Sequence, residues 1–372
     1  SNAGTLQGGA AGSTIQVVNA LNNSGTLSLA TGGADSSVTA DSINNTGTLQ
    51  SKGASTLNVA TAFTNSGTTI NQGNLTLRGT DAAYSVNMTG RLESLATLDI
   101  KGQNGGNGVE ITVGNTGILK GATLAVNSQK LDVQGDATAG GMVNTSGAMT
   151  VNTTQLTMGG IKSRIVAGAG NSVITVTNDF SNRGAIYAAG NLGFKAKSIT
   201  NTNTGGMAAS GNLTAEATQG NFDNSGALYA ADTLTAKASQ TFINRGALAN
   251  EVGTMDAGSA INITANTVSN QSSINSQGGI AISATTFHND VYGGDTRYWT
   301  EVDNSGDKYD KTDSWYDFPD DYEREYWYRT RRTEQKFAGG TPTFKPRIIA
   351  AQNLSITNFN AATNIGGVIS GK

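Results

Sequence analysis

The sequence predicts an all-β chain folded as a right-handed parallel β-helix, a solenoid with coils of about twenty residues. Three observations indicate this fold class. A short motif ending in Asn-x-Gly recurs along the chain, and apolar and polar residues alternate after it. The composition is also bland, with 49 Gly, 14% charged and 6% aromatic residues among 372. Because ordinary globular domains carry about a quarter charged residues, this composition argues against them.

The repeat consists of an apolar residue, a variable residue, Asn, a small polar residue and Gly, followed by alternating apolar positions. Its clearest copies are FSNRGAIYAAGNLGFKAK (180–197), FDNSGALYAADTLTAK (222–237), FINRGALAN (242–250), FTNSGTT (63–69), INNTGTLQS (43–51) and LNNSGTLSL (21–29). Weaker copies are VNMTGRLES (86–94), VGNTGILKG (113–121), VNTSGAMTV (143–151) and VSNQSSINS (268–276). The glycines of the repeat fall at 25, 47, 67, 90, 117, 147, 184, 226 and 246.

Each repeat unit reads as short strands joined by turns. Tyr229 and its second neighbours on either side point one way, whereas Leu228 and Ala230 point the other way. This period of two indicates strands and not helices. At each Asn-x-Gly we expect a left-handed turn, because Asn tolerates that conformation and Gly adopts it freely.

A unit of about twenty residues cannot bury its own apolar side chains, but it can bury them against identical neighbours. Stacking at about 4.8 Å per coil would give a rod of roughly 70 Å. The repeated Asn would then form a ladder of amides at one corner. The residues of this predicted corner ladder are Asn23, Asn45, Asn65, Asn115, Asn182, Asn224 and Asn244. A β-propeller or an antiparallel sandwich fits less well, because a propeller blade needs about forty residues.

The repeat is interrupted between residues 290 and 347. This stretch holds all three Trp, all three Pro and seven of the ten Tyr. Such a shift in composition marks a separate unit. The sequence therefore divides into a cloning remnant (1–3), β-helix repeats (4–289), an aromatic and charged excursion (290–347) and a return to β-helix coils (348–372). Two alternating stretches predict that the excursion is a β-hairpin or small sheet packed on the rod.

The excursion is also the candidate partner-binding surface, because exposed Tyr, Trp and Arg anchor protein interfaces. The candidate residues are Trp299, Tyr322, Tyr326, Trp327, Tyr328, Arg329, Arg331 and Arg332. A structural explanation stands beside this one. A segment that leaves the stacked core needs aromatic residues and ion pairs simply to fold.

The sequence argues against catalysis and against most ligands. There is no Cys and one His, His288, so a Ser-His-Asp site or a Cys/His metal site has almost no residues to draw on. Carbohydrate-active β-helix enzymes need grouped carboxylates, and the 14 Asp and Glu among the first 289 residues are scattered. We expect no cofactor, no metal, no nucleic acid and no insertion into a membrane. A net charge of −3 fits the absence of a nucleic-acid partner.

The copies at 180–197 and 222–237 resemble the repeats of filamentous haemagglutinin. This family contains large exoproteins of two-partner secretion systems of Gram-negative bacteria, including adhesins and CdiA-type contact-dependent inhibition proteins. The resemblance covers most of residues 15–289 and 348–370. The segment EYWYRTRRTEQ, followed by PRIIAAQNLSI, is similar to non-repeat interruptions in such proteins.

The resemblance implies a non-enzymatic structural shaft on the cell surface or in the secreted fraction, exported unfolded through an outer-membrane transporter. The absence of Cys fits such export. It further implies contact with another cell, with a receptor or glycan there as the partner. The alternative function is a carbohydrate-active parallel β-helix enzyme such as a polysaccharide lyase or glycosidase.

Overall fold

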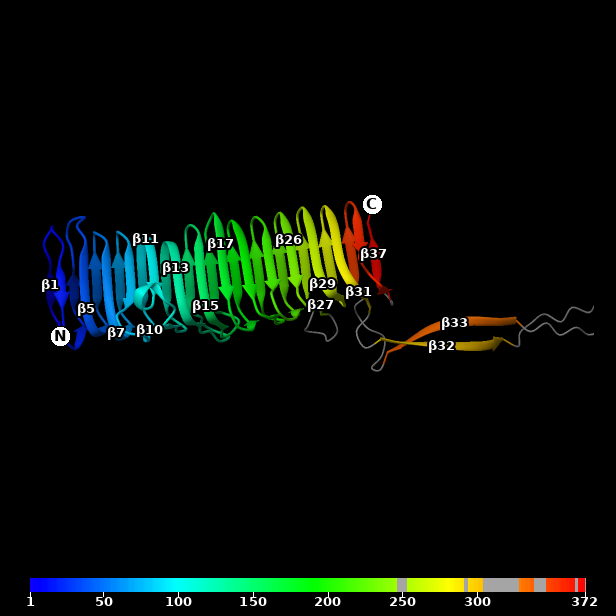
Figure 1. The fold of residues 1–372 in the computed structure, drawn as a ribbon, viewed down its shortest axis with the longest axis horizontal. Coiled ribbons are helices and arrows are strands. Elements are labelled where there is room, and N and C mark those ends of the chain that lie inside the picture. Colours follow the sequence, from blue (N-terminus) through cyan, green and yellow to red (C-terminus); the bar gives the residue numbers. More distant parts are fainter. Residues whose placement is uncertain (246–252, 291–293, 304–327, 338–345, 365–366, 372) are drawn as a thin grey trace, which may run out of the picture.

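The structure is a computed structural model of all 372 residues, and it describes them except for 246–252, 291–293, 304–327, 338–345, 365–366 and 372. The described chain forms a parallel β-solenoid of about 14 turns, as the sequence predicts. Figure 1 shows the coils stacked in chain order, with the two termini at opposite ends of the rod. At about 4.8 Å per coil the rod is roughly 65–70 Å long.

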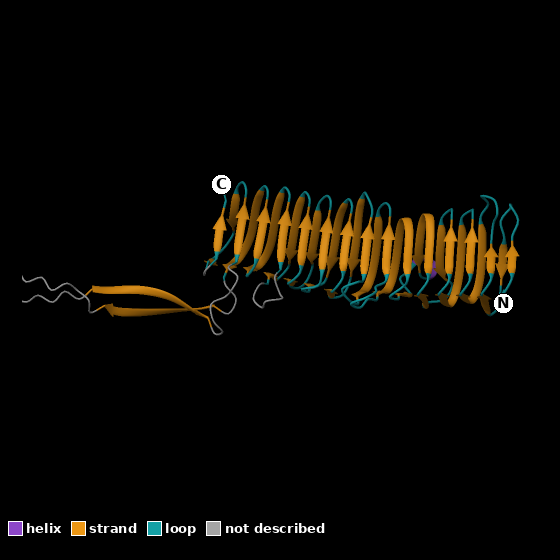
Figure 2. Ribbon diagram, turned by 180° about the vertical axis from the view of Figure 1, so that it is seen from behind, coloured by secondary structure: helices purple, strands orange, loops and turns teal. Residues whose placement is uncertain are grey.

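Each coil contributes strands to three faces, and every strand pairs in parallel with its equivalents in the coils before and after it. Long strands bend around a corner and serve two faces, or three in the case of β13. Figure 2 shows the strands of successive coils side by side along the rod. Among the strands that the structure describes, all but two are therefore hydrogen-bonded into one continuous stack.

The first face ends at the repeated Asn in the coils of both ends of the rod, and at an apolar residue in four coils of its middle. It consists of β3 (Ala20–Asn23), the ends of β5 (Ser36–Asn45) and β7 (Ser55–Asn65), β10 (Tyr84–Met88), β12 (Val109–Val113), the ends of β13 (Ile118–Val133) and β15 (Met149–Met158), β18 (Phe180–Asn182), β21 (Ile199–Asn201), β24 (Phe222–Asn224), β27 (Thr241–Asn244), the ends of β29 (Ala260–Asn270) and β31 (Gly279–Asn289), and β36 (Ala361–Thr363).

The second face follows the Asn-x-Gly turn. It consists of β1 (Thr5–Gln7), β4 (Thr26–Ser28), β6 (Thr48–Ser51), β8 (Thr68–Asn71), the start of β11 (Arg91–Lys101), the start of β13, β14 (Met142–Thr145), β16 (Arg164–Ala167), β19 (Ala185–Ala188), β22 (Gly206–Ala209), β25 (Ala227–Ala230), β28 (Thr254–Ala257), β30 (Ser273–Ser276), β34 (Arg347–Ala350) and β37 (Val368–Ser370).

The third face closes the coil. It consists of β2 (Thr14–Gln16), the starts of β5 and β7, β9 (Leu75–Gly79), the end of β11, the middle of β13, the start of β15, β17 (Asn171–Val176), β20 (Asn191–Ala196), β23 (Leu213–Ala217), β26 (Thr233–Ala238), the starts of β29 and β31, and β35 (Leu354–Thr357). A 3-10 turn (Gln103–Gly105) lies in the loop after β11.

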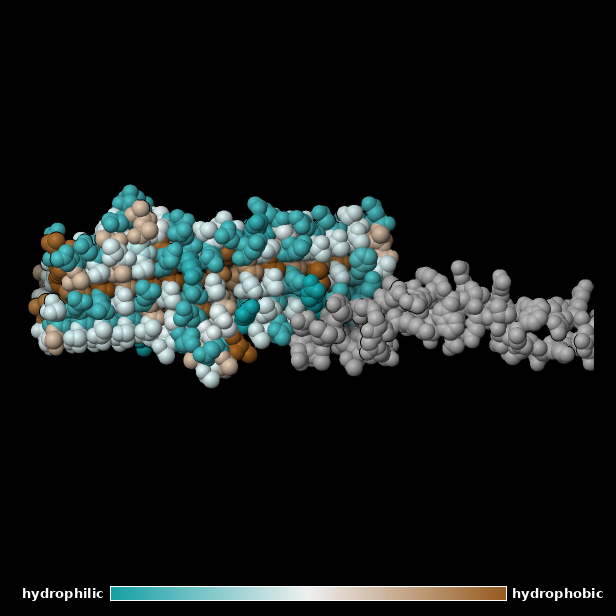
Figure 3. Space-filling model, turned by 90° about the horizontal axis from the view of Figure 1, so that it is seen from below, coloured by the Kyte–Doolittle hydropathy of each residue, from teal (hydrophilic) through white to brown (hydrophobic). Residues whose placement is uncertain are grey.

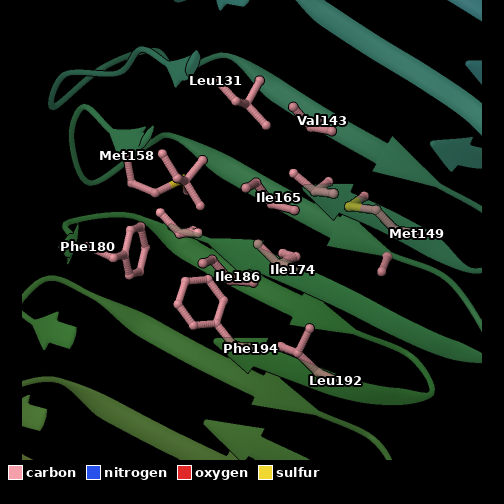
Figure 4. Packing of buried hydrophobic residues seen from close by; sticks show 14 of the residues in the cluster. Leu131, Val143, Met149, Met158, Ile165, Ile174, Phe180, Ile186, Leu192 and Phe194 are labelled. Atoms are coloured by element: carbon pink, nitrogen blue, oxygen red, sulfur yellow. The ribbon is translucent and has the colours of Figure 1, made fainter. Parts of the chain in front are cut away.

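The core fills the interior of the coils along the whole rod, because every second side chain of each strand points inward. Figure 4 shows this packing in the middle of the rod, where Ile165, Ile174 and Ile186 face one another. Phe180 and Phe194 are in ring contact there, with centroids 4.6 Å apart. The face of the rod drawn in Figure 3 is mostly polar, with a band of hydrophobic residues along the rod and smaller hydrophobic patches beside it.

The repeat glycines are required by close stacking and not by a left-handed backbone. Positive φ occurs at Gly12, Gly105 and Gly170 and at two Asn residues, but at none of the described repeat glycines. A Cβ at Gly67 would instead lie 2.1 Å from the carbonyl oxygen of Gly47 one coil earlier. The prediction of left-handed turns was therefore wrong. Glycine is needed because it has no side chain, so the backbones of adjacent coils can approach each other closely. Gly246 lies outside the described residues.

Candidate functional site

The repeated asparagines form a buried column of hydrogen-bonded amides near the N-terminal end. Asn23, Asn45 and Asn65 are at most 1% exposed. The Nδ2 of Asn23 donates to the Oδ1 of Asn45 at 2.7 Å, and Asn45 donates in the same way to Asn65 at 2.7 Å. Asn2 extends this column by donating to Asn23 at 2.8 Å. Each Asn side chain therefore provides the hydrogen-bond donor that the buried amide oxygen of the next coil needs.

A second, longer column follows in the C-terminal part of the rod. Its Nδ2-to-Oδ1 distances lie between 2.7 and 2.9 Å. All donors point toward the C-terminal end. Its members in chain order are Asn182, Asn201, Asn224, Asn244, Asn270, Asn289 and Asn364.

The amides also hold the start of the next coil's second face. Besides its bond to the next amide, Asn23 donates to the carbonyl oxygen of Thr48 at 2.9 Å, and Asn45 donates to that of Thr68 at 3.0 Å. In the second column Asn244 donates to the carbonyl oxygen of Ser273 at 3.1 Å. The two donors of each amide thus connect neighbouring coils at the corner. This arrangement makes the column a structural element and leaves no polar group aimed at a ligand.

Four apolar residues separate the two columns. Register places Met88 above Asn65, followed by Val113, Val133 and Met158 at the same corner. All four side chains are buried, at most 3% exposed, like those of the rest of the core. The amide column is therefore interrupted in the middle of the rod, where the corner is filled by hydrophobic packing.

Asn115 is not part of the column, so its assignment to the corner ladder was wrong. Its Nδ2 donates to Asp136 Oδ2 at 2.8 Å on the surface. Although VGNTG matches the motif, Val113 occupies the corner position, two residues before Asn115. A turn closed by the Gly117 amide and the Gly114 carbonyl oxygen, 2.8 Å apart, then carries Asn115 outward.

The prediction omitted five column members: Asn2, Asn201, Asn270, Asn289 and Asn364. A shorter sequence motif, an apolar residue followed two positions later by Asn, would have found three of them. An apolar residue stands two positions before Asn201, Asn270 and Asn289, with Ile199, Val268 and Phe287 in the core. The copy at 268–276 was identified as a weaker repeat, but Asn270 was left out of the ladder. Requiring Gly two residues after Asn hid the coils of Asn201 and Asn289.

The excursion contains an antiparallel hairpin of β32 (Gly294–Asp303) and β33 (Tyr328–Phe337). Figure 2 shows it as a sheet separate from the solenoid. The register pairs Trp299 with Arg332, Val302 with Arg329, and Asp303 with Tyr328. This result agrees with the predicted hairpin, whereas its packing on the rod stays a prediction.

The hairpin brings part of the candidate surface together. Trp299 lies on one strand, and Tyr328, Arg329, Arg331 and Arg332 lie on the other. The predicted residues Tyr322, Tyr326 and Trp327 lie outside the described residues. Whether these eight residues bind a partner therefore stays a prediction.

His288 lies at the end of β31, where the chain leaves the solenoid. Its Nδ1 is 2.8 Å from Thr363 Oγ1 and 3.4 Å from Asp290 Oδ2. These contacts connect the last coil before the excursion with the first coil after it. They give His288 a structural role at the corner.

Within the described part of the chain, no three His, Asp or Glu side chains gather where they could hold a metal ion. The same part contains no helix long and apolar enough to cross a membrane. The geometry gives no support to the alternative of a carbohydrate-active enzyme, which needs converging carboxylates. The absence of a cofactor stays an expectation.

A stack of short coils, closed by amide columns and without a catalytic constellation among its described residues, defines a fibrous β-solenoid repeat protein. The Haemagglutinin repeat family matches residues 29–102, 145–207 and 208–298. The chain therefore belongs to the haemagglutinin repeat family. No curated protein and no solved structure matches it.

Family and fold together fit the structural shaft of a secreted adhesin. The family is structural and not enzymatic, and membership implies a secreted or cell-surface protein.

Proposed function

We propose that the chain is a shaft segment of a large exoprotein, passed through an outer-membrane transporter, and that the shaft holds a contact-making region away from the cell. The supporting observation is the continuous parallel pairing of strands from coil to coil along about 14 turns. A stack of this kind adds the same length with every coil, so its reach is set by the number of coils. The absence of Cys supports export of an unfolded chain.

We also propose that the excursion at 290–347 makes the contact with a receptor or glycan on another cell. Strands β32 and β33 carry Trp299 and Arg332 at opposite register positions, a pairing of residue types that is enriched at interfaces. The solenoid does not depend on this segment, because β34 pairs with β30 and continues the second face.

The test uses the full-length exoprotein on cells, with residues 292–345 deleted. Three residues would then join Asn289 to Arg347, and the rod already tolerates a four-residue turn between Asn201 and Gly206. We expect normal export and surface display, with attachment to target cells strongly reduced. Attachment that persists at the native level, with display verified, would contradict the proposed role of the excursion.

A second variant tests the shaft itself. Deleting residues 24–65 removes two coils in register, since Asn23, Asn45 and Asn65 occupy equivalent positions. We expect display and attachment to be retained, because the variant still carries the excursion on a shorter shaft. If this displayed variant lost attachment, and two other coils of the rod inserted in place of residues 24–65 did not restore it, the removed coils would make the contact themselves and the role of a spacer would be overturned.

A further inference from the structure

On the second face, two exposed aromatic rings lie on strands β19 and β25, with β22 of the coil between them. Tyr187 and Tyr229 are 38% and 47% exposed, far more than Tyr84 of β10, which is 4% exposed. The register places Ala208 between them, so the two rings lie two coils, about 10 Å, apart. Packing in the core does not account for Tyr187 or Tyr229, because both side chains point outward.

The surface beside these rings is flat and free of bulky side chains. Ala185, Gly206 and Ala227 form the adjacent outward row. A Cβ at Gly206 would meet nothing within 4 Å, so the space above it is open. The hydroxyl groups of Tyr187 and Ser210 are 2.7 Å apart, which fixes the orientation of one ring. A ligand could therefore lie flat across all three coils.

A polar hollow of about 410 Å³ lies at the corner where the same coils enter the second face. Hydroxyl and amide groups line it, from Thr200, Thr202, Asn203, Thr204 and Ser225. Its charged members are Arg183 and Asp223. Asp223 is already paired with Arg245, whose Nε is 2.6 Å from both carboxylate oxygens.

Arg183 has a second cation close by. Arg164 pairs in register with Ala185, two residues after Arg183, and both arginines are exposed. Neither has an ion-pair partner among the described residues. The chain carries a net charge of −3, so two neighbouring unpaired guanidinium groups form a local positive site. Asp256 follows Tyr229 in the next coil and makes the other end of the surface negative.

We propose that this surface, formed by Arg164, Arg183, Tyr187, Tyr229 and the hollow, binds an acidic oligosaccharide. The guanidinium groups would bind its anionic group, since Arg matches the planar geometry of oxyanions. The hydroxyl-lined hollow would hydrogen-bond sugar hydroxyl groups, and the apolar faces of the sugar rings would stack on Tyr187 and Tyr229. Tyr187 stands four positions after Arg183, across the turn and into β19, so the two residues are at most about 13 Å apart, a span that fits a chain of several sugars.

This proposal rests on the proposed function in placing the ligand on another cell, but it is tested with the isolated chain. The probes are a hexamer of galacturonic acid, a sulfated maltohexaose and neutral maltohexaose, each titrated by calorimetry. We expect binding of at least one acidic hexamer, weakened by added salt, and binding of the neutral hexamer at least tenfold weaker. Comparing the affinities of the two acidic hexamers shows whether carboxylate or sulfate is preferred.

Two substitutions locate the site. Arg183→Gln should weaken binding of the acidic hexamer about tenfold and reduce its salt dependence, because a charge-assisted hydrogen bond is lost. Tyr229→Ala should weaken it by a similar factor without changing the salt dependence. Lys237→Gln, an exposed cation on the third face, is the matched control and should have no effect.

The chain lacking residues 292–345 separates this proposal from the role of the excursion. It should bind the acidic hexamer as well as the complete chain does. Absence of binding by all three hexamers would overturn the proposal, as would native-strength binding by both Arg183→Gln and Tyr229→Ala. Either result would leave the shaft function untouched.

Discussion

At the scale of single residues, the buried Asn side chains replace hydrophobic packing by hydrogen bonds that run along the rod. Asn45 accepts from Asn23 and donates to Asn65, and it is fully buried. Such a residue stabilises the stack only while all its partners are present, because a buried polar group without a partner costs about 1–3 kcal/mol.

Replacing Asn45 should therefore destabilise the solenoid more than a surface change does. In Asn45→Ala, the amides of Asn23 and Asn65 each lose one partner, so we expect a loss of about 2–4 kcal/mol in the free energy of unfolding. Denaturant unfolding followed by circular dichroism measures this loss. Asn44→Ala is the control on the same strand, since Asn44 is exposed and should change stability by less than about 0.5 kcal/mol. Equal stability of the two variants would contradict the role of the column.

Glu93 provides a second residue-scale test, through pH. Its side chain is 3% exposed and forms ion pairs with Arg91 and with Lys120, whose Nζ is 2.9 Å away. Burial alone would raise the pKa of Glu93, but the hydrogen bonds and charges of Lys120 and Arg91 outweigh it and lower the pKa below its ordinary value of 4.5. The resulting stabilisation is fully present above the unfolded-state pKa and is lost as pH falls through the lower, folded-state value.

Thermal unfolding at pH 7 and at pH 3 should show this dependence. We expect the melting temperature to fall more steeply with acid in the native chain than in Glu93→Gln, which cannot lose a charge. Glu110→Gln serves as the control, because Glu110 is exposed on the first face. If Glu93→Gln kept the full acid sensitivity of the native chain, the ion pairs would not be responsible.

At the scale of the coil, the glycine of the Asn-x-Gly turn determines how closely neighbouring coils stack. A Cβ at Gly67 would lie 2.1 Å from a backbone oxygen, which cannot move as a flexible side chain can. Gly67→Ala should therefore cost about 1–3 kcal/mol through overpacking. Gly206→Ala is the matched control, because a Cβ there meets nothing within 4 Å. Unchanged denaturant midpoints in both variants would contradict this explanation.

The coil is also the scale at which sequence-based prediction succeeded and failed. Alternation predicted the strands, because an inward apolar position at Leu228 or Phe222 is visible in any single coil. Register between coils was less predictable. Val113 occupies the corner and the turn closed between Gly114 and Gly117 follows it, so the motif containing Asn115 matched two residues out of register.

The interruption of the amide column was beyond prediction for the same reason. Met88, Val113, Val133 and Met158 look like ordinary core residues in sequence, and only the pairing of strands shows that they replace Asn. The cluster of Arg164, Arg183 and Tyr187 was equally hidden. It brings together residues of adjacent coils that share no motif.

At the scale of the whole molecule, the solenoid should behave as a modular rod whose parts can be removed separately. The chain lacking residues 292–345 should keep its melting temperature within about 3 °C, because the stack carries the cooperative contacts between coils. Circular dichroism melting measures this. A collapse of the melting transition would instead mean that the excursion supports the rod.

The most direct test of the account is the length of that rod. Small-angle X-ray scattering on the chain lacking 292–345 should give an elongated particle of roughly 65–70 Å. The further deletion of residues 24–65 removes two coils that are in register with their neighbours. It should shorten the particle by about 10 Å and leave its cross-section unchanged. An unchanged length, or a wider and shorter particle, would contradict a shaft built from stacked coils.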